Sequence, residues 1–182
     1  MSFRYEIRLS GEGGQGLVLA GKVLAEAAAI YDNLNATQSQ SYGPEARGGA
    51  SRSEVIISDD EIDYPKAVSL DILLALTQES CTRYWKDLKE SGILLVDGDA
   101  VKDIPQGPFR VYKIPVTRIA EQEVGKALVA NIVSLGIITG LSKIVSREAV
   151  EAAILARVPK GTEELNIKAL EAGLRAAEQL HP

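Results

Sequence analysis

The stretch Ser10-Gly-Glu-Gly-Gly-Gln-Gly16 determines how the fold of this chain begins. It follows an apolar alternation, Tyr5 to Leu9, that predicts a β-strand, and it precedes residues 17–30, whose apolar side chains recur at helical spacing. Its spaced glycines match the pattern G-x-G-x-x-G, in which backbone N–H groups and a helix N-terminus can approach an anion closely. Two interpretations stay open at this point, a nucleotide-binding turn and a purely structural one.

Asp32 bears on the choice between these two interpretations. It lies about the right distance after the turn to bind the ribose of a dinucleotide. The helical periodicity, however, places Asp32 at the end of the first helix, whereas a ribose-binding carboxylate belongs at the end of the second strand. The predicted position of Asp32 at the end of a helix therefore argues against NAD.

Strands and helices alternate through the rest of the chain. Further strands are predicted at 33–37, 53–57, 71–76, 92–96 and 109–114, and helices at 78–89, 117–124, 130–144, 146–157 and 162–180. A loop rich in Ser, Gly and Pro is predicted over 39–51. The alternation predicts a largely parallel sheet, and the β-branched run 53–57 predicts an antiparallel member. We expect one domain over 1–182, a Rossmann-like three-layer α/β domain with a mixed, mostly parallel sheet and a helical C-terminal third.

Small and polar residues add detail to the helical third. Ser146 and Thr162 are predicted helix N-caps. Gly136 and Gly140, four residues apart, predict close packing against another helix. Asn131, within the apolar run, either caps its helix or faces a partner.

The composition excludes several classes of function. Twenty Lys and Arg against 25 Asp and Glu give a net charge of −5, which argues against nucleic-acid binding. A single cysteine, Cys81, cannot form an internal disulfide or supply the four thiolates that an iron–sulfur cluster usually needs. The only histidine is His181, which argues against a histidine-dependent triad and a His/Cys zinc site. We expect no metal site in this chain.

The apolar segments argue against a membrane protein. The longest of them, 132–141, is interrupted by Ser, Thr and Gly and is too short to span a bilayer. The first ten residues lack an apolar core of signal-peptide length. We therefore expect a cytoplasmic protein that contacts no membrane.

A second unusual stretch, "QSYGPEARGG" at 40–49, concentrates glycines around an aromatic residue and an arginine. Proline fixes one φ angle, and the glycines let the backbone approach a neighbour closely. Such a loop suits binding to another surface or to an anionic ligand. The alternative is a structural turn in which Glu45 and Arg47 pair with one another.

Two acidic stretches have simpler explanations than a cofactor site. The stretch "VDGDA" at 96–100 superficially suggests the GDG motif of thiamine diphosphate enzymes, but its triplet is Asp97-Gly98-Asp99 and Asn131 lacks a second Asn beside it. We predict a turn that ends a strand. The carboxylates within 59–63 are predicted to form a solvated turn rather than a metal site.

Three motifs together resemble a known family. "GEGGQG" at 11–16, "SYGPEARGGAS" at 41–51 followed by "SEVIIS" and "IDYPKA", and "NIVSLGIITGL" at 131–141 are similar to motifs of the gamma subunits of 2-oxoacid:ferredoxin oxidoreductases. The 2-oxoglutarate type is the most similar, and the resemblance covers nearly the whole chain.

The resemblance implies a Rossmann-like subunit of a larger enzyme, without catalytic residues of its own. That enzyme oxidatively decarboxylates a 2-oxoacid with coenzyme A as co-substrate, forming an acyl-CoA and reducing ferredoxin. Thiamine diphosphate, magnesium and the iron–sulfur clusters would lie in partner subunits, namely alpha and beta subunits and a ferredoxin-like delta subunit, and none would be bound by this chain alone. The resemblance places interface or ligand-facing residues at Gly11, Gly13, Gly14, Gln15, Gly16, Tyr42, Gly43, Pro44, Glu45, Arg47, Gly48, Gly49 and Asn131.

Two other functions stay open beside this one. The literal G-x-G-x-x-G supports a stand-alone NAD(P) oxidoreductase, which the position of Asp32 weakens. The chain could also be a non-catalytic scaffold whose only role is assembly. Measuring nucleotide binding to the pure chain distinguishes the NAD(P) oxidoreductase from the other two functions. Measuring the activity of a complex with an altered loop distinguishes the non-catalytic scaffold.

Overall fold

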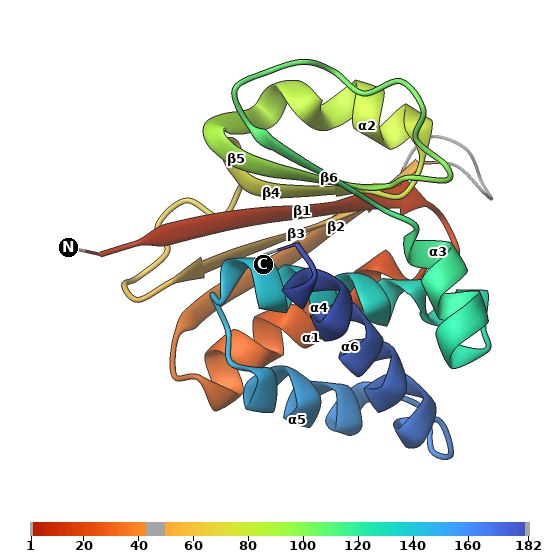
Figure 1. The fold of residues 1–182 in the computed structure, drawn as a ribbon. Helices are drawn as coiled ribbons and strands as arrows, with labels where there is room; N and C mark the ends of the chain where they lie inside the picture. Colours follow the sequence, from red (N-terminus) through yellow and green to blue (C-terminus); the bar gives the residue numbers. More distant parts are fainter. Residues whose placement is uncertain (1, 43–49, 181–182) are drawn as a thin grey trace.

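A computed structural model describes residues 2–42 and 50–180, which form a six-stranded sheet between two layers of helices (Figure 1). The strand order is β2-β3-β1-β4-β5-β6. The neighbours β1–β4, β4–β5 and β5–β6 are parallel, whereas β3 is antiparallel to both β1 and β2. The strands are β1 Arg4–Glu12, β2 Asn35–Tyr42, β3 Ala50–Ser58, β4 Leu70–Ala75, β5 Leu88–Asp97 and β6 Arg110–Ile114. The predicted mixed, mostly parallel sheet is confirmed.

The helices divide unequally between the two faces of the sheet. Helix α2 lies on one face, and α1, α4, α5 and α6 lie on the other (Figure 1). The α-helices are α1 Leu17–Glu26, α2 Gln78–Tyr84, α3 Val116–Ile119, α4 Ala130–Ser142, α5 Arg147–Arg157 and α6 Glu163–Glu178. Short π-helical turns, Ala27–Tyr31 and Ala120–Val124, extend α1 and α3, and 3₁₀ turns occur at Trp85–Asp87 and Ala127–Val129. The three-layer α/β arrangement and the helical C-terminal third are as predicted.

The burial pattern explains why these segments adopt these elements. In β1, Ile7 and Leu9 are fully buried in the core that α1 and α4 cover, which accounts for the alternation in its sequence. Strand β4 is central and buried on both faces, so its sequence is a nearly continuous apolar run. Helix α4 is buried from Ala130 to Thr139 because it lies between the sheet and α6.

Helices α4 and α6 cross at a pair of glycines. A Cβ added at Gly173 would lie 2.1 Å from the carbonyl oxygen of Val133 and 2.9 Å from the Cα of Gly136. A Cβ added at Gly136 would in turn lie 2.4 Å from the carbonyl oxygen of Leu170. Gly140 faces Ala177 in the same contact. The close helix packing predicted from Gly136 and Gly140 is confirmed, and Gly173 is its counterpart.

Several boundaries differ from those predicted. The loop predicted over 39–51 is shorter, because 39–42 pair with 51–54 of β3 and Ala50 pairs with Glu12 of β1. The helix predicted over 78–89 ends at Tyr84, and Leu88 and Lys89 already belong to β5, where Leu88 pairs with Leu70. In both places, pairing with a neighbouring strand overrides the local pattern.

Both predicted N-cap residues occupy that position, but only Ser146 caps a helical N–H with its side chain. The Ser146 hydroxyl accepts a hydrogen bond from the N–H of Ala149, which caps α5 as expected. Thr162 does occupy the N-cap position of α6, but its hydroxyl donates to the carbonyl of Pro159 and caps no helical N–H. Thr162 is therefore at the predicted N-cap position of α6, without a capping hydrogen bond to its side chain.

Candidate functional site

The predicted site segments converge on the edge of the sheet where β1 ends. The glycine-rich turn leads from β1 into α1, and Asn131 lies at the start of α4 beside it. The flanks of the second loop reach the same edge, since Glu12 pairs with Ala50 and Tyr42 pairs with Ser51. The loop itself, with Gly43, Pro44, Glu45, Arg47, Gly48 and Gly49, lies outside the described residues.

Gln15 folds back over the turn that contains it. Its Oε1 accepts a hydrogen bond of 2.6 Å from the N–H of Glu12. A Cβ added at Gly11 would lie 2.1 Å from that oxygen, so the glycine leaves room for the Gln15 side chain. Gly14 adopts a left-handed conformation with φ of 92°. The turn thus uses its glycines, and one of its N–H groups, for its own packing.

Asn131, in the first turn of α4, is hydrogen-bonded to the glycine-rich turn. Its Nδ2 donates a hydrogen bond of 3.0 Å to the carbonyl of Gly16, and its Oδ1 accepts one of 2.9 Å from the N–H of Ile132. Gly16 has a φ of 73°, and a Cβ there would lie 2.4 Å from Nδ2. Asn131 is buried and joins the first turn of α4 to the turn before α1. The amide nitrogen and the amide oxygen of Asn131 are therefore both hydrogen-bonded inside the chain.

Two cavities open beside the glycine-rich turn, and residues of the 3₁₀ turn Ala127–Val129 line both of them. The first has a volume of about 210 Å³ and is lined by Gly14, Gln15, Leu76, Thr117, Ala127, Leu128 and Ala130. The second has a volume of about 250 Å³ and is mainly apolar, lined by Gly16, Leu19, Lys126, Leu128, Val129, Asn131, Val158, Pro159, Thr162, Leu165 and Asn166. Leu128 lines both cavities. Sequence analysis missed this residue, because a leucine just before an apolar run carries no distinctive signal.

Asp32 lies at the opposite end of the first helical segment from the glycine-rich turn. It follows the π-helical turn after α1, as predicted, and its carboxylate accepts hydrogen bonds of 2.6 Å and 2.7 Å from the N–H and hydroxyl of Ser146. Asp32 therefore anchors the start of α5.

We expect the pure chain to bind NAD(H) and NADP(H) weakly or not at all. The physical reasons are the engagement of Asp32 by Ser146 and the use of the Glu12 N–H by Gln15. Isothermal titration calorimetry of the pure chain measures this directly. A dissociation constant in the low micromolar range, about −8 kcal/mol, would contradict the prediction.

Asp97 has a structural role in the stretch at 96–100. Its carboxylate accepts a hydrogen bond of 3.1 Å from the N–H of Asp99 and one of 2.7 Å from the hydroxyl of Thr117 at the start of α3. Asp99 instead pairs with the guanidinium of Arg118 at 2.8 Å. The strand-ending turn predicted here is confirmed, with both carboxylates bound by side chains of this chain.

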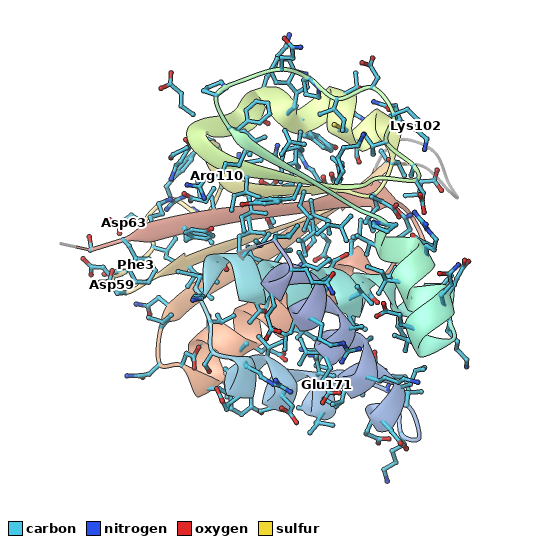
Figure 2. The ribbon with its side chains drawn as sticks, in the orientation of Figure 1. Phe3, Asp59, Asp63, Lys102, Arg110 and Glu171 are labelled. Carbon is cyan, nitrogen blue, oxygen red and sulfur yellow. The ribbon has the colours of Figure 1, made fainter. Side chains whose placement is uncertain are left out.

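Carboxylates of the acidic turn after β3 accept hydrogen bonds from backbone N–H groups of this chain. Asp59 accepts a hydrogen bond of 2.8 Å from the N–H of Phe3, and the two lie together at the end of the sheet away from the glycine-rich turn (Figure 2). Asp60 accepts from the N–H of Glu61. Over residues 2–42 and 50–180, no group of His, Cys, Asp and Glu is arranged to hold a metal ion.

The thiol of Cys81 is buried in the smaller core under α2. Burial, with a smaller contribution from Asp103, raises the pKa of this thiol to about 11. It therefore stays protonated at neutral pH and is a poor nucleophile and metal ligand.

Within the same described ranges, no helix combines the length and apolar character needed to cross a membrane.

A polar network lies beside α2, over β1 and β3. Arg8 is buried, and its guanidinium pairs with Asp87 and, at 3.1 Å, with Glu54. The same guanidinium lies 5.0 Å from the ring centroid of Tyr84, with Arg52 at 5.4 Å. A cavity of about 490 Å³ adjoins this network, lined by Arg8, Thr37, Gln38, Ser39, Gln40, Ser41, Arg52, Glu54, Pro65, Lys66, Ala67 and Val68. Sequence analysis missed it, although charged residues alternate with apolar ones along β1.

The chain is similar to known proteins over nearly its whole length. The model of the family "Pyruvate ferredoxin/flavodoxin oxidoreductase" matches residues 6–176. The 2-oxoglutarate synthase subunit KorC of Methanocaldococcus jannaschii is 54% identical over 182 residues, covering 99% of this chain and 97% of that protein. The crystal structure of a keto/oxoacid ferredoxin oxidoreductase gamma subunit from Geobacter sulfurreducens has a TM-score of 0.87 and 54% identity, covering 96% of this chain and 99% of that one.

A more distant relative carries the same domain inside a longer chain. The ketoisovalerate oxidoreductase subunit VorA of Methanothermobacter thermautotrophicus is 32% identical over 178 residues, which are 95% of this chain but 36% of that protein. The similarity of the solved gamma-subunit structure agrees with the α/β fold described above. The chain belongs to the pyruvate ferredoxin/flavodoxin oxidoreductase family.

Proposed function

We propose that this chain is the gamma subunit of a multisubunit 2-oxoglutarate:ferredoxin oxidoreductase. The observation that carries the proposal is the 54% identity to a 2-oxoglutarate synthase subunit across essentially the full length of both chains. The complex would cleave carbon dioxide from 2-oxoglutarate, transfer the remaining acyl group to coenzyme A and pass the released electrons to ferredoxin. We place it in the cytoplasm, where the single buried thiol of Cys81 stays reduced.

The chemistry of this reaction would belong to the partners. The only cysteine is buried, and the Asp97 and Asp99 carboxylates are bound within this chain. We therefore assign thiamine diphosphate and magnesium to alpha and beta subunits, and the iron–sulfur clusters to a ferredoxin-like delta subunit or another partner. Coenzyme A is the co-substrate. This chain would contribute the surface around the glycine-rich turn to the contacts of the assembled enzyme.

We expect the isolated chain to be colourless and inactive, and the assembled complex to be active. The chain should copurify with larger subunits from its host, and adding it to a preparation that lacks it should restore 2-oxoglutarate-dependent reduction of ferredoxin. The measurements are the visible absorption spectrum and a CoA-dependent reduction assay with each oxoacid in turn. An iron–sulfur absorbance band or oxoacid-dependent dye reduction by the pure chain would overturn the proposal.

Arg47 is the side chain of the second loop that we expect to matter most for the reaction. The oxoacid carboxylates and the CoA phosphates are anions, and a planar guanidinium can bind either in a bidentate manner that lysine does not reproduce. A hydrogen bond to a charged group contributes about 1.5–3 kcal/mol, so Arg47→Ala should lower kcat/KM about 10- to 150-fold. Steady-state kinetics of the reconstituted complex, with oxoacid and CoA varied separately, test this.

Assembly must be measured beside activity in the Arg47 experiment. Size-exclusion chromatography shows whether complexes with Arg47→Ala and Arg47→Lys form. If both form and their kcat/KM values stay within about threefold of wild type, Arg47 only pairs locally with Glu45, an exposed pair contributing under about 1 kcal/mol. If neither forms, the loop is an interface element and this chain's contribution is assembly.

A further inference from the structure

We propose that the cavity beside Arg8 binds the phosphate group of a small molecule. The cavity has a volume of about 490 Å³, and none of its lining residues belongs to the glycine-rich turn. The inference therefore adds a ligand site on another part of the sheet, and it does not rest on the proposed function.

Three strands place polar side chains on one face of the sheet at this cavity. Arg8 on β1 lies opposite Glu54 on β3, and Glu54 lies opposite Ser39 on β2. Two residues away on β3, Arg52 lies opposite Ser41 in the same manner. Residues directly opposite one another in antiparallel strands point to the same face, as do residues two apart on one strand. All five residues line the cavity.

The lining offers more hydrogen-bond donors than the chain itself uses. Arg52 donates from its Nε to a β2 hydroxyl at 2.8 Å, and its terminal nitrogens have no hydrogen-bond partner among residues 2–42 and 50–180. Over the same part of the chain, the Lys66 ammonium and the Ser39 hydroxyl also have none. A ligand rich in acceptor oxygens would use these donors.

Arg8 adds a buried donor to the wall of the cavity. Its side chain is 4% exposed, and its Nε is the single buried side-chain nitrogen or oxygen without a hydrogen-bond partner among the residues that the structure describes. A buried donor without a partner costs free energy, and a bound ion is one of the groups that can satisfy it. An oxyanion in the cavity that Arg8 lines can supply this partner.

The charges of the lining favour an anion. Arg8, Arg52 and Lys66 line the cavity together with a single carboxylate, that of Glu54. Asp87, outside the lining, pairs with Arg8, and an excess of positive charge remains even when Asp87 is counted. The whole chain, by contrast, has a net charge of −5. A phosphate monoester carries about −1.5 to −2 charges and three acceptor oxygens, which suits several convergent donors better than the two oxygens of a carboxylate.

The segment before β4 that carries Lys66 is held in place by two arginines. Arg4 donates to the carbonyls of Tyr64 and Lys66 at 2.6 Å and 3.0 Å, and Arg8 donates to the carbonyl of Ala67 at 3.2 Å. Binding therefore requires little further ordering of this backbone. The cavity volume lies in the range of small-molecule sites, so a phosphorylated metabolite fits as well as free phosphate.

Isothermal titration calorimetry of the purified chain at constant ionic strength tests the site. The probes are inorganic phosphate, glycerol 3-phosphate and succinate. We expect at least one of the two phosphate compounds to bind with a dissociation constant below about 1 mM, and succinate to bind at least about tenfold more weakly. Tighter binding of glycerol 3-phosphate identifies a phosphate ester as the ligand, and tighter binding of inorganic phosphate identifies the free ion.

Two substitutions remove donors from the lining, and a third is the matched control. Arg52→Gln and Lys66→Gln should each weaken phosphate binding about tenfold or more, because each removes a charged hydrogen-bond donor. Arg110→Gln removes an exposed arginine from β6, which forms the opposite edge of the sheet from β2 (Figure 2). This control should bind phosphate within about twofold of wild type, because it lies outside the cavity.

Thermal unfolding in phosphate-free buffer shows which variants are folded. Lys66→Gln decides the test if Arg52→Gln, which also loses its contact with Glu54, does not fold. No binding of either phosphate compound by the wild-type chain overturns the site, as does unchanged binding by the folded variants. Equal loss with Arg110→Gln would show that overall charge alone governs binding, and equally tight binding of succinate would overturn the assignment to phosphate.

Discussion

Arg8→Ala is expected to lower the free energy of unfolding by about 3 kcal/mol. The Arg8 side chain is 4% exposed and bridges Glu54 on β3 to Asp87 after α2, and it also donates to the carbonyl of Ala67 at 3.2 Å. Removing it leaves the mostly buried Glu54 carboxylate without its principal partner. We place the effect at the lower end of the range for broken buried pairs, because Asp87 is 47% exposed and Glu54 keeps Arg52 at 3.6 Å.

Chemical denaturation of the purified chain measures the effect of Arg8→Ala. The control is Arg118→Ala, which breaks an ion pair with Asp99 in which the two side chains are 51% and 48% exposed. Solvent screens that pair, so its loss should cost less than about 1 kcal/mol. Equal effects of the two substitutions would show that the buried network beside α2 adds no more to stability than a surface pair.

Gly173→Ala is expected to destabilise the chain by about 3 kcal/mol, the upper end of the range for overpacking. The added Cβ would lie 2.1 Å from the carbonyl oxygen of Val133 and 2.9 Å from the Cα of Gly136. Both are backbone atoms of α4, so no side chain can rotate away and the two helices have to separate. For a chain of this size the melting temperature should fall by about 6 to 12 °C.

Gly98→Ala is the matched control for this substitution. A Cβ there meets its nearest neighbour, the Cβ of Lys113, at 3.5 Å, which is ordinary contact. Its melting temperature should stay within about 2 °C of wild type, which corresponds to the few tenths of a kcal/mol of an ordinary surface change. If differential scanning calorimetry finds Gly173→Ala as stable as Gly98→Ala, the close approach of α4 and α6 does not govern the stability of the helical third.

Local patterns in the sequence were sufficient for much of the fold. The alternation in β1, the glycine-rich turn and the helical spacing of α1 each occupy a few consecutive residues, and their geometry follows from local sterics and burial on one face. Asp32 was correctly placed at the end of the first helical segment for the same reason. The small residues of α4 likewise predicted a close helix contact, although they did not identify Gly173 as the facing residue.

Contacts between distant segments decided the rest. The polar segment 39–42 is a strand because β3 pairs with it, and Leu88 is in a strand because β4 does. Arg8, Glu54 and Asp87 form one network, and Asn131 holds Gly16, only after folding brings together residues up to 115 positions apart. Sequence periodicity reports which face of an element is buried, because burial repeats with the geometry of the backbone. It does not report which element covers that face, so the cavities beside Leu128 and Arg8 emerge only from the tertiary structure.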